Sequence, residues 1–172
     1  MTLLVLSDSH GNTYALREAI DRARPDGILF AGDGLRDLTY CDSNVPLWAV
    51  RGNCDILLSQ SLIVNGREID APEEEIVVID GIRILLLHGH TVGVKSGLAN
   101  AIERAALRGA DVLVYGHTHR PVECRITPED TSYGSLLQKP LLLFNPGSIG
   151  KDHCFGTLTV RGGQVLGSLT GL

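Results

Sequence analysis

The sequence predicts an α/β fold in which two mixed β-sheets pack together and helices cover their outer faces. In the first third of the chain, short apolar runs alternate with a helical repeat, an order typical of parallel strands joined by helices. Further along, two pairs of apolar runs are separated by tight-turn residues, at Asp80-Gly81 and at Gly162-Gly163, which is typical of antiparallel hairpins. Because only two segments show clear helical spacing, we expect two strand-rich layers in contact, with the helices outside.

The first third predicts three strands and one helix. Apolar residues recur at helical spacing from Ala15 to Ala23, and Pro25 ends this helix. Asn12 or Thr13 can cap its first turn. The predicted strands are Leu3–Leu6, Gly27–Phe30 and Leu47–Val50.

The rest of the chain predicts hairpins around a second helix. This helix carries apolar residues at helical spacing from Leu98 to Ala106, and Gly109 is its expected end. The polar segment Thr127–Gln138 is expected to be a long loop or insertion, and since no linker divides the chain we expect one domain over residues 1–172. The predicted strands are Glu75–Ile79, Ile82–Leu87, Val112–Tyr115, Leu141–Phe144, Gly156–Val160 and Gln164–Leu169.

Composition excludes several classes of protein. The net charge of −5 leaves no global basic surface, so we do not expect nucleic acid as a partner. No apolar run approaches the roughly 20 residues that span a bilayer, and the run Met1–Leu6 is expected to be a strand rather than a signal peptide. The four cysteines form no Cys-x-x-Cys pair, which predicts neither a zinc knuckle nor a disulfide framework, and a reducing cytoplasm is the expected location.

Side chains that commonly bind metals follow the apolar ends of five predicted strands. The carboxyl ends of parallel strands meet at one edge of a sheet, where ligands gather. Any one of these side chains alone is more often a surface residue, a helix cap or a turn residue. Together they include five of the six histidines if His90 is counted, and scattered surface residues do not explain that placement. The seven candidate metal ligands are Asp8, His10, Asp33, Asn53, His88, His117 and His119.

Carboxylate and imidazole donors in this number can hold two metal ions side by side. Two ions about 3.5–4 Å apart can generate a hydroxide nucleophile and neutralise charge on a phosphoryl group, which is the chemistry of phosphate-ester hydrolysis. Mixed nitrogen and oxygen donors suit transition metals better than calcium. We therefore expect two divalent metal ions as cofactors, manganese first and iron, zinc, nickel or cobalt as alternatives, and a small phosphate ester as substrate.

Five segments resemble, in order and residue type, the five motifs of the calcineurin-like metallophosphoesterase superfamily. The segments are Asp8-Ser9-His10, Gly32-Asp33, Gly52-Asn53-Cys54-Asp55, His88 and Gly116-His117-Thr118-His119. The Gly-Asn-Cys-Asp form, the His-Gly-His segment at residues 88–90 and the Asn-Pro-Gly-Ser segment at residues 145–148 are most similar to its small single-domain YfcE-type phosphodiesterase branch. The resemblance covers nearly the whole chain and implies a four-layer αββα sandwich.

The resemblance also implies roles for these residues. The first metal ion would be held by Asp8, His10 and His119, the second by Asn53, His88 and His117, and Asp33 would bridge the two ions. A metal-bridging hydroxide would attack phosphorus, and the metals would neutralise the equatorial oxygens. Asp33 and Asn53 would thus take part directly in catalysis.

Cys54 departs from the pattern of many larger members, which carry a histidine at this position as candidate proton donor to the leaving group. A thiol with an ordinary pKa of about 8.5 is a poor substitute for imidazolium at neutral pH. We therefore expect esters whose leaving group needs little protonation, or a different donor; a phosphodiester is the leading expectation and a phosphomonoester the alternative. His90 is the nearest candidate donor by sequence, with support of a ligand or contact with substrate as the alternative. Cys54 itself is expected to be a packed small residue.

Four neighbouring residues carry weaker expectations. Asp55 is expected to orient a ligand histidine. Asn145 is interpreted as an ordinary turn residue rather than an amide presented to the site. Arg36 and Arg120 lie close to the motifs, and a solvated surface position is favoured for each over contact with substrate phosphate.

The main alternative to an enzyme is a non-catalytic scaffold, since the same fold is similar to the Vps29 subunit of the retromer complex. A scaffold can lose metal ligands freely, whereas all seven positions here carry competent residues, which favours the enzyme. A purely structural metal site fits poorly because such sites favour closed, cysteine-rich shells. Exposed hairpin edges make a homodimer an expectation.

Overall fold

The first sheet is built from the N-terminal apolar runs and the C-terminal hairpin. In spatial order its strands in the computed structural model are β12 (Gln164–Gly171), β11 (Cys154–Arg161), β1 (Thr2–Leu6), β2 (Gly27–Phe30) and β3 (Leu47–Ala49). Strands β1, β2 and β3 are parallel, and the hairpin adds β11 antiparallel to β1. The structure describes residues 1–41, 44–56 and 61–172.

The second sheet is also mixed. Its strands in spatial order are β6 (Glu74–Ile79), β7 (Ile82–Leu87), β8 (Val112–Val114), β10 (Leu141–Asn145) and β9 (Val122–Ile126). Strands β7, β8 and β10 are parallel, while β6 and β9 pair antiparallel at the two edges. Asp80 and Gly81 both have positive φ, 48° and 79°, as the predicted tight turn between β6 and β7 requires.

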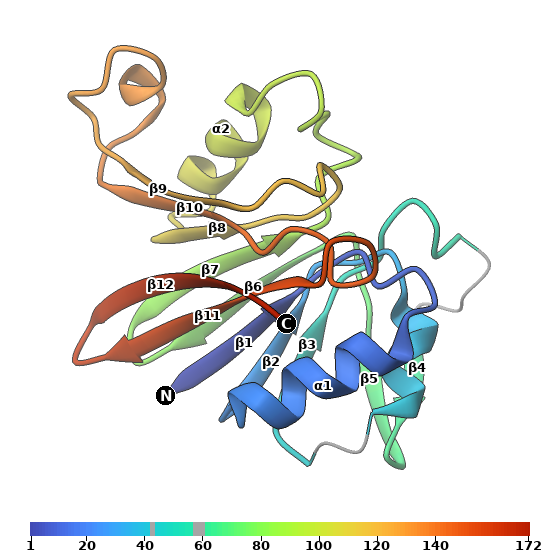
Figure 1. The fold of residues 1–172 in the computed structure, drawn as a ribbon. Coiled ribbons are helices and arrows are strands. Elements are labelled where there is room, and N and C mark those ends of the chain that lie inside the picture. Colours follow the sequence, from blue (N-terminus) through green and yellow to red (C-terminus); the bar gives the residue numbers. More distant parts are fainter. Residues whose placement is uncertain (42–43, 57–60) are drawn as a thin grey trace.

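The two sheets face each other, and helices cover their outer faces, so the predicted αββα sandwich is confirmed (Figure 1). The core between the sheets combines apolar side chains of both, such as Val5 and Leu29 from the first and Ile84 and Val114 from the second. On the outer face of the first sheet lie α1 (Thr13–Ala23) and the 3-10 helix η1 (Leu35–Tyr40). On the outer face of the second lie α2 (Ala99–Leu107) and the short η2 (Gly134–Leu136).

The ends of α1 follow the sequence signals. The Asn12 side chain accepts a hydrogen bond from the Ala15 N–H at 3.1 Å, so Asn12 rather than Thr13 is the cap. Arg24 takes a left-handed conformation after the last turn, and Pro25 follows it. The helix therefore begins and ends where side-chain chemistry predicts.

Besides the 3-10 helix η1, two strand features were missing from the predicted elements. A small hairpin of β4 (Ser61–Val64) and β5 (Arg67–Asp70) packs beside η1, and its Asn65-Gly66 turn is a hairpin signal that the sequence carries. Strand β9 is the other, and it directly precedes the predicted loop. In agreement with that prediction, Thr127–Gln138 contains no strand and holds only η2.

All four cysteines are free thiols, as their scattered positions predict. Over the described ranges, none of the helices has the length and apolarity that a bilayer crossing needs.

Candidate metal centre

The carboxyl ends of β1, β2 and β3 in the first sheet adjoin those of β7 and β8 in the second. Backbone and side-chain contacts join the two sets of loops: the His117 N–H donates to Asp8 Oδ2 at 3.1 Å, and His88 Nδ1 lies 2.7 Å from the carbonyl oxygen of Ala31. The seven candidate ligands predicted from the sequence all lie in these loops. Five of them have left-handed backbone, namely Asp8, His10, Asp33, His117 and His119. Such conformations cost on the order of 1 kcal/mol or more in residues other than glycine and gather at functional sites.

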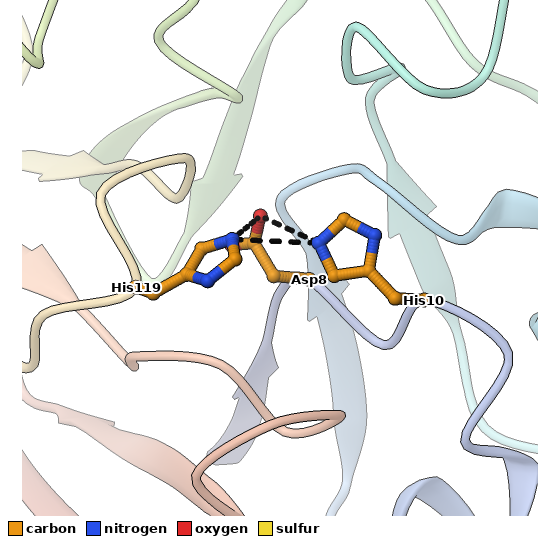
Figure 2. Close-up of side chains that lie close together, drawn as sticks. All are labelled: Asp8, His10 and His119. Atoms are coloured by element: carbon orange, nitrogen blue, oxygen red, sulfur yellow. Dashed lines mark hydrogen bonds and ion pairs between the residues drawn. The ribbon is translucent and has the colours of Figure 1, made fainter.

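Asp8, His10 and His119 form the first group of donors, and Figure 2 shows their side chains converging from the loops after β1 and β8. His119 Nε2 lies 3.1 Å and His10 Nε2 lies 3.8 Å from Asp8 Oδ1. The two histidine nitrogens are 3.4 Å apart. Three donor atoms at these separations can contact one ion placed between them.

One carboxylate oxygen of the buried Asp8 side chain accepts no hydrogen bond within the described part of the chain. Asp8 Oδ2 accepts hydrogen bonds from the Ser7 hydroxyl at 2.5 Å and from the His117 N–H. Its Oδ1 accepts none from any residue that the structure describes, although it is buried. A buried carboxylate oxygen without a donor is costly unless a cation compensates it, so this atom fits a metal ion.

Asp33, His88 and His117 form the second group. His88 Nε2 lies 3.4 Å from Asp33 Oδ2 and 3.2 Å from His117 Nδ1. The Ala31 carbonyl beside His88 Nδ1 requires a proton on that nitrogen, which leaves Nε2 with its lone pair toward the site. Backbone contact thus fixes the tautomer of His88 that a metal ligand needs.

Burial and neighbouring charged groups shift the pKa values of all three residues of this second group. Burial alone would raise the pKa of Asp33, but hydrogen bonds from His88 and from the Cys54 N–H hold it well below its usual range. Burial lowers the pKa of His117 to about 4, helped by the charges of His88 and Lys95. Burial opposes protonation of His88 too, yet its hydrogen bond to Asp33 and the negative charges of Asp8 and Asp33 together raise its pKa.

Asp33 occupies the position between the groups. Its carboxylate belongs both to the group with His88 and His117 and to a third cluster with His10 and Cys54, in which all donor atoms lie within 4.8 Å of one another. Its Oδ1 also accepts the Cys54 N–H at 2.8 Å.

Asn53 presents an oxygen that fits a cation. Its Nδ2 donates to Cys54 Sγ at 3.3 Å, which directs the amide, and its buried Oδ1 finds no hydrogen-bond donor within the described part of the chain. An unpaired buried amide oxygen, like Asp8 Oδ1, suits an ion as partner.

His90 lies at the edge of the site. Its ring centroid is 5.4 Å from that of His88 and 6.2 Å from that of His117, and its Nε2 lies 3.5 Å from Glu73 Oε2. Burial and the charge of His88 lower the pKa of His90, which weakens it as a proton donor at neutral pH. Its catalytic role stays a prediction.

Two expectations about the Gly-Asn-Cys-Asp segment are wrong. The Asp55 carboxylate orients no histidine: it accepts the N–H groups of Asp33 and Gly52 on Oδ2 and those of Gly34 and Leu35 on Oδ1, at 2.9–3.0 Å. A buried carboxylate with four backbone donors holds two loops in register. Cys54 is exposed rather than packed, and its Sγ lies within 4.8 Å of donor atoms of His10 and Asp33.

The sequence did not indicate the residues that support the loop after β1 through hydrogen bonds. Buried Asp37 in η1 accepts the Ser9 hydroxyl at 2.5 Å and the Gly11 N–H at 2.8 Å. The Ser148 hydroxyl donates to the Asp8 carbonyl at 2.9 Å. Asp37 lies in a segment that carries no motif. The one local signal is Gly34, the glycine before η1, where a Cβ would lie 1.9 Å from Ser9 Oγ.

Asn145 does more than form a turn. Its Oδ1 accepts the Gly147 N–H, as the predicted turn requires, and its amide donates to the Gly116 carbonyl and to Thr118 Oγ1 at 3.0 and 3.1 Å. It therefore braces the loop that carries His117 and His119. Arg36 is exposed, as predicted.

The sequence profile of the calcineurin-like phosphoesterase superfamily domain matches residues 1–162. The chain belongs to this superfamily. It is 38% identical over 168 residues to the phosphodiesterase YfcE of Escherichia coli strain K12, an alignment that covers 87% of this chain and 79% of YfcE. The matched range includes every segment that carries the seven predicted donors.

Solved structures show the same fold at lower sequence identity. A predicted phosphoesterase from Streptococcus pneumoniae TIGR4 superimposes with a TM-score of 0.66 at 21% identity, covering 98% of this chain and 97% of that one. Wild-type Vps29 from Entamoeba histolytica, solved with zinc, superimposes with a TM-score of 0.63 at 18% identity, covering 99% and 98%. Both likenesses concern the fold alone, since enzymes and Vps29 proteins share it.

Proposed function

We propose that the protein is a phosphodiesterase that acts on a small phosphate ester with two divalent metal ions, manganese first among them. Asp8, His10 and His119 would hold one ion, Asn53, His88 and His117 the other, and Asp33 would contact both. When bound, the ions supply a hydroxide nucleophile and neutralise charge on the phosphoryl oxygens. The observation that carries the proposal is the carboxylate of Asp33, which lies within reach of His10 on one side and of His88 and His117 on the other.

The residues of the chain prepare this site before substrate arrives. The Ala31 carbonyl fixes the His88 tautomer, and burial keeps His117 neutral. Asp55 ties the Asp33 and Gly52 N–H groups to one carboxylate, so Asp33 and Asn53 keep a fixed relation. Donors held by backbone contacts need little reorganisation during the reaction.

The surroundings of the leaving group favour diesters. Partial desolvation and the Asp33 carboxylate raise the pKa of the Cys54 thiol to about 11, even though its side chain reaches solvent. Such a thiol and a weakly basic His90 offer little general acid at neutral pH. Esters with readily departing groups fit this site, and the likeness to YfcE, a phosphodiesterase, supports the same preference.

The test is hydrolysis of bis-p-nitrophenyl phosphate in manganese buffer by Asp33→Asn and His117→Ala. Loss of a ligand is expected to lower kcat/KM by about a hundredfold or more, since even residues that only support ligands cost 10- to 100-fold. His153→Ala is the matched control, because His153 also has positive φ, 54° against 65° for His117, but lies outside the site. Wild-type turnover in both site variants would refute the proposal.

Turnover also separates the enzyme from a scaffold. A Vps29 protein of this fold was solved with zinc, so metal binding alone does not distinguish the two functions. A purified protein that binds manganese in the expected ratio yet hydrolyses no ester in a broad panel would favour the scaffold.

A further inference from the structure

A groove with a volume of about 370 Å³ adjoins the loop that carries His117 and His119. Thr118, which lies between these two histidines, and Arg120, which follows them, are in its wall, opposite the segment that carries Lys95. Val94, Leu98 and Val122 supply apolar wall surface. We call this feature the Lys95–Arg120 groove.

The groove opens at the rim of the candidate metal centre. Thr118 Oγ1 is held by the Asn145 amide at 3.1 Å, which fixes the wall relative to both neighbouring histidines. A ligand whose phosphate sits between the donor groups can therefore extend into this groove.

The charge of the groove is unusual for this chain. Lys95 and Arg120 are exposed, and neither forms an ion pair with any described residue, although the whole chain carries a net charge of −5. The groove wall contains no acidic side chain. Two unpaired cations that line one groove repel each other, and an anion bound in the groove would offset that repulsion.

A second groove, beside His90, has the reverse charge. It is lined by Asp70, Glu73 and Glu75, with Arg51 as its one cationic side chain. An anionic group placed there would meet three carboxylates. The charge distribution therefore directs an anionic extension of the substrate toward Lys95 and Arg120.

We propose that the Lys95–Arg120 groove binds a second phosphate group of the substrate, with the organic part between the two phosphates packed against Val94, Leu98 and Val122. This rests on the proposed function, because the scissile phosphate must lie between the donor groups. The substrate class is then a phosphodiester whose organic group ends in a further phosphate. Arginine binds phosphate through paired N–H donors and lysine as a point charge.

Two chromogenic esters that differ only in the second phosphate test this. They are the p-nitrophenyl ester of thymidine 5′-phosphate and the same ester carrying a 3′-phosphate. The wild-type protein is expected to prefer the second by kcat/KM, and Lys95→Ala and Arg120→Ala are each expected to lower that preference about tenfold or more, as loss of a charged hydrogen bond does. Arg161→Ala, an exposed cation at the tip of the β11–β12 hairpin, is the control and should keep the wild-type ratio. An unchanged ratio in the Lys95→Ala, Arg120→Ala double variant would overturn the proposal.

A binding measurement separates this proposal from the proposed function. Calorimetry on metal-depleted protein compares thymidine 3′,5′-bisphosphate with thymidine 5′-phosphate, and the bisphosphate is expected to bind more tightly in the wild type, with the advantage lost in the double variant and reduced by salt. If neither ester is hydrolysed but this binding pattern is observed, the phosphodiesterase function is refuted and phosphate binding in the Lys95–Arg120 groove is supported. If both esters are hydrolysed and the double variant binds the bisphosphate as the wild type does, phosphate binding in the groove is refuted and the phosphodiesterase function is supported.

Discussion

The carboxylate of Asp33 is positioned mainly by backbone groups. The Cys54 N–H donates to its Oδ1, and Asp55 accepts the Asp33 N–H, so the loops after β2 and β3 are locked together. Gly52 makes this close approach possible, because a Cβ at that position would lie 2.0 Å from Asp33 Oδ1. The backbone of Gly52 is not in the left-handed region, so the glycine is required for space rather than for conformation.

Replacing Gly52 by alanine is expected to displace Asp33 and to lower kcat/KM for a phosphodiester by about a hundredfold, as a misplacement of about 1 Å can do. Gly171→Ala is the control, since its backbone also accepts alanine and the nearest heavy atom lies 4.0 Å from the added Cβ. Steady-state kinetics with thermal unfolding of both variants provides the measurement. Equal activity of Gly52→Ala and wild type would show that the position of Asp33 does not matter.

Replacing Cys54 by histidine is expected to supply the proton donor that the exposed thiol does not provide. Rates on monoesters with poor leaving groups should rise relative to rates on diesters, because an imidazolium titrates near neutral pH and can protonate the departing oxygen. The ratio of monoester to diester kcat/KM is the readout. An unchanged ratio would count against a missing donor as the cause of the diester preference.

At the scale of elements, one carboxylate joins the second sheet to its covering helix. Glu74 at the start of β6 forms ion pairs with Arg104 at 2.7 Å and with Arg108, both on the α2 side of the sheet. The hydrogen bond from Arg104 is the main reason that the pKa of Glu74 lies below its ordinary value of 4.5. A depressed pKa in the folded state means that the carboxylate stabilises the fold above pH 4.5 and loses that effect as pH falls through the folded-state pKa.

Glu74→Gln is therefore expected to lower the free energy of unfolding at pH 7, with the difference from wild type shrinking as the pH is lowered below 4.5. The effect should be modest, because both arginines are partly exposed and water screens the pairs. Urea unfolding at several pH values measures it. Glu103→Gln, which removes an exposed acid on α2 that forms neither of these ion pairs, is the control for loss of a carboxylate from this layer. A pH-independent difference for Glu74→Gln would contradict the account.

The elements that were predictable are those whose signal is local. Apolar runs, the Asn12 cap and the Asp80-Gly81 turn lie within a few residues of one another, and each was confirmed. The site residues were predictable for a similar reason, since each directly follows a strand. Asp37 and Ser148 were not, because their partners lie 26 to 140 residues away along the chain. Asp55 was assigned the wrong partner because three of its four backbone donors come from the segment after β2, 20 to 22 residues away along the chain.

At the scale of the whole molecule, the candidate centre draws its donors from both sheets. Strands of the first sheet are followed by four of the seven donors, Asp8, His10, Asp33 and Asn53. Strands of the second sheet are followed by the other three, His88, His117 and His119. The two halves meet where parallel strands end, which is the one edge at which residues from strands far apart in sequence can converge. The sandwich therefore supplies a rigid frame for ligands that no single element could hold together.

The central claim is that these donors hold a pair of ions around Asp33. The most direct measurement is anomalous scattering from crystals grown with manganese. Two anomalous peaks about 3.5–4 Å apart, one on each side of the Asp33 carboxylate, are the result that we predict. A single peak, or an Asp33 side chain turned away from His88 and His117, would contradict it.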